Sequence, residues 1–327
     1  MIAARSFAKQ AVGVFGLAGS GGAAVRALAA GGASVFAWDD DADWRAAALS
    51  DGAITMPFGE WPWARIRALV LCADLPRTHP VILAAQAANA EIVGELEVFA
   101  REIRPQRGAK GRAPVVAVTG DSGKSTTAAL IGHILSSGGF AAEVGGAIGR
   151  SALELAAPSG RAVYVLEVAS DQIDLSPGLV PDVAVLTEVA SDRPLPEDRA
   201  AGEARLLERT SGQVCIGVDD IHAASICTRL AAGGAEVVPV SIGKVLGRGI
   251  FAVDGALYDA QGQRATKVMD LSAAHHLVGV QDWRNAALAY AATKPLVKDS
   301  RAIARSIASF PGLAQPIAHA APKRQAS

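Results

Sequence analysis

The sequence contains few cysteines, few aromatic residues and no excess of charge of either sign. Aromatic side chains make up 5% of the 327 residues, and the three cysteines, Cys72, Cys215 and Cys227, are far apart. Such an odd, widely spaced set excludes a disulfide framework and is typical of a reduced, cytoplasmic chain. The 31 basic and 32 acidic residues give a net charge of −1, which provides no electrostatic basis for a nucleic-acid partner. No apolar run approaches the ~20 residues that span a bilayer, so we expect no membrane insertion.

Apolar side chains, in contrast, are abundant. They make up 50% of the chain, which is enough to bury substantial cores, and the length of 327 residues favours two domains. Predicted strands and helices alternate, which indicates an α/β fold with parallel sheets. A polar stretch rich in proline and glycine, residues 101–114, separates two such series. We therefore predict a first domain over residues 1–105, a second over 106–313 and a loose tail over 314–327.

The segment 115–127 combines a strand, a glycine-rich turn and the start of a helix. Its short apolar, β-branched run predicts a strand that is buried on both faces, and helical spacing follows over 128–135. Amide N–H groups and the helix dipole converge at such a turn and bind phosphate groups. We therefore predict a nucleoside triphosphate site of the short TGxxGKST form. The alternative is an ordinary strand–helix turn with an exposed lysine.

In this site, Lys124 is expected to reach the outer phosphates and Ser125 to ligate the accompanying Mg²⁺. The predicted nucleotide-binding residues of the turn are Thr119, Gly120, Asp121, Ser122, Gly123, Lys124, Ser125 and Thr126.

A second glycine-rich loop, residues 16–22, lies between a predicted strand at 11–15 and a predicted helix at 23–30. The next predicted strand, 33–38, ends at Asp39, about twenty positions after the glycines, as in dinucleotide-binding folds. The spacing is GxxGxG and not GxGxxG, so three interpretations stay open. They are NAD binding, binding of a nucleotide-sugar diphosphate at the helix N-terminus, and a purely structural unit.

The remaining elements follow the same alternation. We predict strands at 68–72, 162–168, 179–187, 214–220 and 236–242, a strand plus turn at 91–99, and helices at 80–90, 283–293 and 301–309. Glu167 lies near the end of one of these strands. In a P-loop fold, a carboxylate in this position commonly holds Mg²⁺ directly or through water. The alternative is a surface glutamate at a strand end.

The order of these motifs resembles that of the Mur ligase family of peptidoglycan synthesis, and the resemblance covers nearly the whole chain. It rests on residues 16–21 with 38–40, and on 118–127, 144–149, 164–174, 181–185, 217–220, 283–286 and 310–313. The chain is most similar to the members that join D-glutamate to UDP-N-acetylmuramoyl-L-alanine. The resemblance implies a Rossmann-like amino-terminal domain followed by a P-loop ATPase domain with a mostly parallel sheet.

The resemblance also implies an ATP-dependent amide ligation in the cytoplasm. ATP phosphorylates the carboxylate of UDP-N-acetylmuramoyl-L-alanine, and the amine of D-glutamate attacks the acyl phosphate. This chemistry requires lysine, Mg²⁺ and carboxylates to neutralise phosphoryl charge. By the family's motifs, Lys124 and Glu167 would be catalytic, Ser125 and Glu167 would hold Mg²⁺, and Asn285 would contact adenine. The uridine diphosphate pocket would be lined by Gly16, Leu17, Ala18, Gly19, Ser20, Gly21 and Asp39.

Several positions differ from the family's pattern. Arg193 stands at a metal-binding histidine, and a guanidinium cannot ligate Mg²⁺. Glu203 stands at a carbamylated lysine, so it either substitutes for the carbamate or is a solvated helix glutamate. The family also carries a third, carboxyl-terminal domain, which we expect this chain to lack. Two functions follow as alternatives: a ligase whose missing domain a partner chain supplies, and a non-catalytic ATP-binding member of the family.

Overall fold

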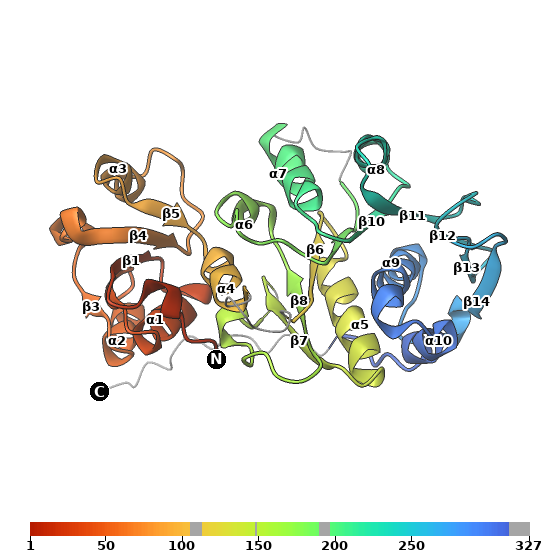
Figure 1. Ribbon diagram of the computed structural model, residues 1–327, viewed down its shortest axis with the longest axis horizontal. Helices are drawn as coiled ribbons and strands as arrows, with labels where there is room; N and C mark the ends of the chain where they lie inside the picture. The colour runs from red at the N-terminus through yellow and green to blue at the C-terminus, as the bar shows by residue number, and fades with distance from the viewer. Residues whose placement is uncertain (105–112, 148, 190–196, 314–327) are drawn as a thin grey trace.

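The computed structural model describes residues 1–104, 113–147, 149–189 and 197–313, with the backbone alone at 197–200. Within these residues, two largely parallel sheets follow one another along the long axis of the molecule, and helix α4 (Glu95–Ile103) lies between them (Figure 1). The predicted α/β fold is therefore confirmed. The predicted tail and most of the predicted linker lie outside the described residues.

The first sheet has the Rossmann-like strand order β3-β2-β1-β4-β5, and every pair in it is parallel. Its strands are β1 (Ala11–Phe15), β2 (Ser34–Trp38), β3 (Ile54–Thr55), β4 (Ile66–Leu71) and β5 (Glu91–Val93). Helices α1 (Ser20–Ala30) and α2 (Ala42–Ser50) cover one face, and α3 (Pro80–Ala87) covers the other. Alternate side chains are buried on opposite faces, since Val14 packs with α1 and Phe15 packs with α3.

The second sheet has the order β14-β13-β12-β11-β10-β9-β6-β8-β7. Its strands are β6 (Val115–Thr119), β7 (Ala141–Gly146), β8 (Ala162–Glu167), β9 (Val183–Leu186), β10 (Gln213–Gly217), β11 (Glu236–Ile242), β12 (Ile250–Val253), β13 (Ala256–Asp259) and β14 (Thr266–Asp270). The pairs from β7 to β12 are parallel, and the two pairs made by β13 are antiparallel. Because β6 lies between β8 and β9, the carboxyl ends of these three strands meet at one edge, where ligands bind in such sheets.

Helices cover both faces of the second sheet. On one face lie α5 (Lys124–Ser137), α9 (Val280–Val297) and α10 (Ser300–Ala308), and on the other lie α4, α6 (Ser170–Asp174), α7 (Glu197–Glu208) and α8 (Ile221–Ala232). Val116 and Val118 of β6 are buried with α5, whereas Val115 and Ala117 are buried with α4. This burial on both faces explains why β6 is a continuous apolar run.

The prediction of a strand plus turn over 91–99 was wrong in its second half, because Glu95 begins helix α4. Glutamates at 95 and 97 alternate with apolar residues there, and this alternation imitates a half-buried strand. Both glutamates are in fact buried, and each accepts a hydrogen bond from a residue between strands of the second sheet. Ser151 Oγ donates to Glu95 Oε1 at 2.6 Å, and Gly178 N donates to Glu97 Oε2 at 2.5 Å. Helix α4 thereby joins the two sheets, while the predicted domain boundary at 105/106 stays a prediction.

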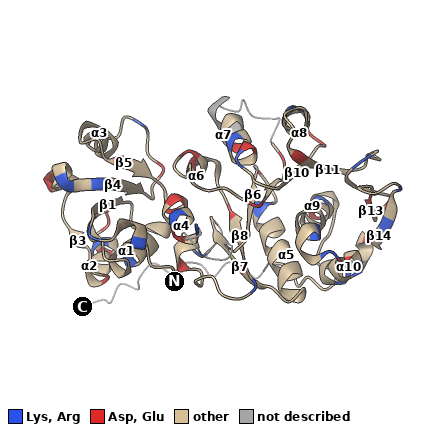
Figure 2. Cartoon of the chain, viewed as in Figure 1, with Lys and Arg blue, Asp and Glu red and all other residues tan. Residues whose placement is uncertain are grey.

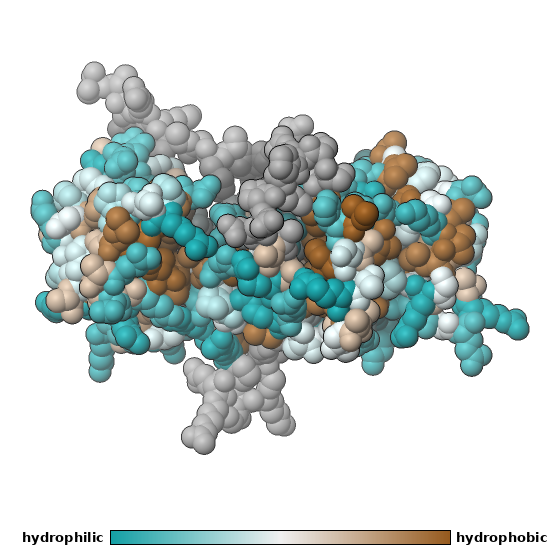
Figure 3. Space-filling view, turned by 90° about the horizontal axis from the view of Figure 1, so that it is seen from above, coloured by the Kyte–Doolittle hydropathy of each residue, from teal (hydrophilic) through white to brown (hydrophobic). Residues whose placement is uncertain are grey.

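Charged and apolar residues are mixed over the surface. Figure 2 shows acidic and basic residues interspersed on both halves of the chain, and Figure 3 shows hydrophilic and hydrophobic residues interspersed on one face. Among the described residues, no helix combines the length and the apolar character that a membrane span requires.

Candidate nucleotide site

The loop 120–123 connects β6 to α5 at the carboxyl edge of the second sheet, so the predicted strand, turn and helix are all present. Gly123 has a φ of +78°, in the left-handed region that glycine adopts without strain, and α5 begins at the next residue. The first amide groups of α5 therefore face the loop. Lys124 Nζ donates to Gly120 O at 2.8 Å, which holds the ammonium group against the same loop.

Ser125 and Glu167 lie together beside this loop. Ser125 Oγ donates to Glu167 Oε2 at 2.7 Å, and Glu167, the last residue of β8, is buried. The alternative of a surface strand-end glutamate is therefore wrong. Hydroxyl and carboxylate oxygens are ligands that Mg²⁺ prefers, and at phosphate sites this ion takes only one or two of them from the protein. The pair thus fits Mg²⁺, even though no cluster of three or more His, Cys, Asp or Glu side chains suited to a metal occurs among the described residues.

The first two turns of α9 lie beside the phosphate loop. Asn285 is 1% exposed, and its Oδ1 atom has no hydrogen-bond partner among the described residues. A Cβ atom added to Gly123 would lie 2.3 Å from Asn285 Oδ1, so this amide is directly beside the loop. A buried amide oxygen without a partner is costly in a folded protein, and a ligand that donates a hydrogen bond would satisfy it.

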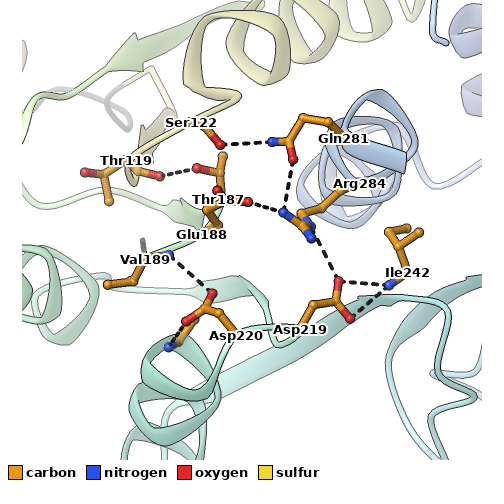
Figure 4. Close-up of polar contacts among 11 residues, drawn as sticks. Thr119, Ser122, Thr187, Glu188, Val189, Asp219, Asp220, Ile242, Gln281 and Arg284 are labelled. Carbon is orange, nitrogen blue, oxygen red and sulfur yellow. Dashed lines mark hydrogen bonds and ion pairs between the residues drawn. The ribbon is translucent and has the colours of Figure 1, made fainter. Parts of the chain in front are cut away.

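A chain of polar contacts extends from the loop through α9 to the ends of β9 and β10 (Figure 4). Gln281 Nε2 donates to Ser122 Oγ at 3.1 Å, and Arg284 Nη1 donates to Gln281 Oε1 at 3.1 Å. Arg284 also pairs with Glu188, and its Nε atom lies 3.4 Å from Asp219 Oδ2. Sequence analysis missed this network. The signal available in the sequence was the position of Glu188 and Asp219, because each follows the end of one of two neighbouring parallel strands.

The other predicted site lies at the carboxyl edge of the first sheet. The loop after β1 leads into α1 at Ser20, and Asp39, directly after β2, accepts a hydrogen bond from Leu17 N at 2.6 Å. A Cβ atom on Gly21 would lie 1.8 Å from Gly16 O, so the first turn of α1 requires glycine there. The structure therefore brings the predicted loop residues and Asp39 together.

Glu203, in α7, is 1% exposed and accepts a hydrogen bond from Ser170 Oγ at 3.1 Å. The expectation of a solvated helix glutamate is therefore wrong, because Glu203 is buried against the start of α6. Whether its carboxylate substitutes for a carbamate stays a prediction. Arg193 lies outside the described residues.

Known proteins resemble the chain over nearly its whole length. It is 43% identical over 325 residues to the UDP-N-acetylmuramoylalanine–D-glutamate ligase of Phenylobacterium zucineum, and the match covers 96% of this chain and 69% of the relative. It is 40% identical to the protein of the same name from Caulobacter sp. (strain K31), again over 96% of this chain and 69% of the relative. No model of a protein family matches the chain.

Solved structures of lower identity share the fold. A murein peptide ligase from Psychrobacter arcticus matches with a TM-score of 0.59 at 16% identity, over 93% of this chain and 69% of that one. A UDP-N-acetylmuramate–alanine ligase from Thermotoga maritima matches with a TM-score of 0.57 at 15% identity, over the same shares of the two chains.

Proposed function

The chain belongs to the UDP-N-acetylmuramoylalanine–D-glutamate ligase family, and from this membership we propose that it joins D-glutamate to UDP-N-acetylmuramoyl-L-alanine with consumption of ATP. The observation that carries the proposal is the convergence of Lys124, Ser125 and Glu167 on one loop at the carboxyl edge of a P-loop sheet. The relatives are named as ligases, which favours catalysis over the non-catalytic alternative. The predicted partner chain and the predicted lack of a third domain stay predictions.

We also propose a cytoplasmic location, which the three free cysteines support.

We assign ATP to the loop between β6 and α5. The amide groups at the start of α5 and the Lys124 ammonium would bind its phosphates, as the positive end of a helix and a lysine do in P-loop proteins. Ser125 and Glu167 would hold Mg²⁺, which supplies positive charge to offset the charge of the phosphates. The unsatisfied Asn285 amide oxygen supports a place for this side chain against the nucleotide.

We assign the uridine diphosphate group to the loop after β1. Residues 16–21 and the N-terminus of α1 would receive the diphosphate, because unpaired amide groups and the helix dipole favour anions there. The hydrogen bond from Leu17 N to Asp39 supports this assignment, since it fixes the loop to the end of β2. The ligase family membership favours this ligand over NAD.

The test is ADP release from Mg-ATP in the presence of UDP-N-acetylmuramoyl-L-alanine, with and without D-glutamate. We expect release that depends on D-glutamate and yields the amide product. Binding of Mg-ATP without such release would instead support the non-catalytic alternative.

The Lys124→Ala variant tests the phosphate assignment by titration calorimetry. We expect it to abolish detectable Mg-ATP binding, because the loop would lose its only lysine. The exposed Lys267, which pairs with Asp270 far along the sheet at β14, provides the matched control Lys267→Ala, for which we expect unchanged binding. Equal affinity of the Lys124→Ala and wild-type chains would refute the assignment.

A further inference from the structure

Arg284, near the start of α9, connects three partners from different parts of the chain (Figure 4). It donates to Gln281 in its own helix, pairs with Glu188 after β9, and lies beside Asp219 after β10. Its side chain is only 15% exposed, so these contacts are partly shielded from water and salt. A guanidinium is permanently charged and offers several donors in a rigid plane, which suits a bridge of this kind.

Two of these partners hold successive residues of the phosphate loop. The backbone oxygen of Glu188 accepts a hydrogen bond from Asp121 N at 2.9 Å, and the Gln281 amide donates to Ser122 Oγ at 3.1 Å. The loop is thus attached to β9 on one side and to α9 on the other. Arg284 contacts both Glu188 and Gln281, the two residues that make these attachments.

The third partner of Arg284, Asp219, is itself held in place by hydrogen bonds. Asp219 accepts hydrogen bonds from Ser241 Oγ at 2.6 Å and from Ile242 N at 3.0 Å, so its carboxylate is held by β11. The bridge also balances charge, because Glu188 and Asp219 without Arg284 would be two neighbouring carboxylates near a site for anionic phosphates. Like charges in such a place oppose anion binding.

We propose that Arg284 is a positioning residue for nucleotide binding, which preforms the loop at Asp121 and Ser122 through Glu188 and Gln281. The inference rests on the proposed ATP site and adds a residue to it that does not itself need to touch the nucleotide. A loop that is already ordered binds its ligand more tightly, because less conformational entropy is lost on binding.

The first experiment compares the wild-type chain with the Arg284→Gln variant. We expect the Kd of Mg-ATP to rise roughly 10-fold, which corresponds to about 1.4 kcal/mol of binding free energy. We also expect faster hydrogen exchange of the Asp121 amide without nucleotide. The matched control is Arg229→Gln, which breaks the exposed Arg229–Glu208 pair of 2.9 Å between α8 and α7 and should change neither measurement.

A second variant keeps the inference testable if Arg284→Gln does not fold. Gln281→Met keeps a side chain of similar length and leaves the ion pairs of Arg284 intact, but it removes the link to Ser122 and the hydrogen bond that Gln281 accepts from Arg284. We expect a rise of a few-fold in the Kd of Mg-ATP. In turnover assays, the KM for ATP should rise in both variants, while kcat and the KM for the UDP-linked substrate stay close to wild type.

The outcomes separate this inference from the proposed function. Wild-type affinity for Mg-ATP in both variants, while Lys124→Ala does not bind, would overturn the positioning role and leave the ATP site in place. Failure of the wild-type chain itself to bind Mg-ATP would overturn the ATP site and this inference together.

Discussion

Replacement of Gly123 by alanine tests how closely α9 packs on the phosphate loop. Two separate effects should destabilise this variant. Gly123 has a φ of +78°, and the left-handed conformation costs a residue with a side chain roughly 1–2 kcal/mol. The new Cβ would also lie 2.3 Å from Asn285 Oδ1 and 3.0 Å from Gln281 Nε2, so these side chains or the loop must shift. Forcing an extra methyl group into a packed site costs about 1–3 kcal/mol.

Gly234 provides a control in which only the first effect operates. It has a φ of +88°, and a Cβ added there meets no atom within 4 Å. Alanine also reduces the entropy of the unfolded chain, which returns about 0.4–1 kcal/mol in both variants. We therefore expect Gly234→Ala to lower the free energy of unfolding by about 1 kcal/mol and Gly123→Ala by about 2–4 kcal/mol.

Urea denaturation of the three chains measures these free energies, and calorimetry with Mg-ATP shows whether the loop still binds phosphate. Gly123→Ala should also bind Mg-ATP far more weakly, whereas Gly234→Ala should bind it as the wild type does. The Gly123→Ala/Asn285→Ala double variant removes the atom that the Cβ would strike, so it should lose less stability than the sum of the two single changes. Equal destabilisation by Gly123→Ala and Gly234→Ala would refute the close packing of α9 on the loop.

Two further predictions concern buried carboxyl groups. Burial raises the pKa of Glu95 above its ordinary 4.5, so its contribution to stability is complete below that value and is lost at higher pH. Glu95→Gln should therefore gain stability relative to wild type as the pH rises from 4 to 8, and a pH-independent difference in urea midpoints would contradict this. Burial opposes ionisation of Asp259, but hydrogen bonds from Lys294, Gln261 N and Tyr290 outweigh it and lower its pKa below 3.8. The stabilisation by the Asp259 carboxylate is therefore present above that value and lost in acid. Asp259→Asn should lower the free energy of unfolding by roughly 2–4 kcal/mol at pH 7 and by less near pH 3. Thermal unfolding at the two pH values measures this difference.

The parts of the fold that the sequence predicted are those in which local pattern and tertiary environment agree. The run Val115–Thr119 is apolar because both faces of β6 are covered, and the glycines that follow it are required by backbone geometry. The prediction for the residues of α4 failed because its buried glutamates accept hydrogen bonds from Ser151 and Gly178, which are distant in the sequence. The local sequence pattern carries no information about these partners. Strands β12–β14 were not predicted, since each has four or five residues and their pairing depends on one another.

The same distinction applies to the site. Lys124 and Ser125 belong to one continuous motif, so the sequence alone indicates them. Arg284 and Glu188 acquire meaning only when the sheet brings the ends of β9 and β10 beside α9, because an arginine on a helix is otherwise an ordinary surface residue.

Two buried carboxyl groups, those of Glu167 and Glu203, are linked through the segment that follows β8. Glu167, at the end of β8, accepts a hydrogen bond from Ser125 of α5, and Ser170, the first residue of α6, donates to Glu203 of α7. One short segment therefore contacts helices on both faces of the sheet. Glu203 stands where the family's pattern has a carbamylated lysine, and its buried side chain contacts the start of α6. A departure that looks like a loss in the sequence thus places a buried carboxyl group in contact with Ser170, three residues after Glu167 in the chain.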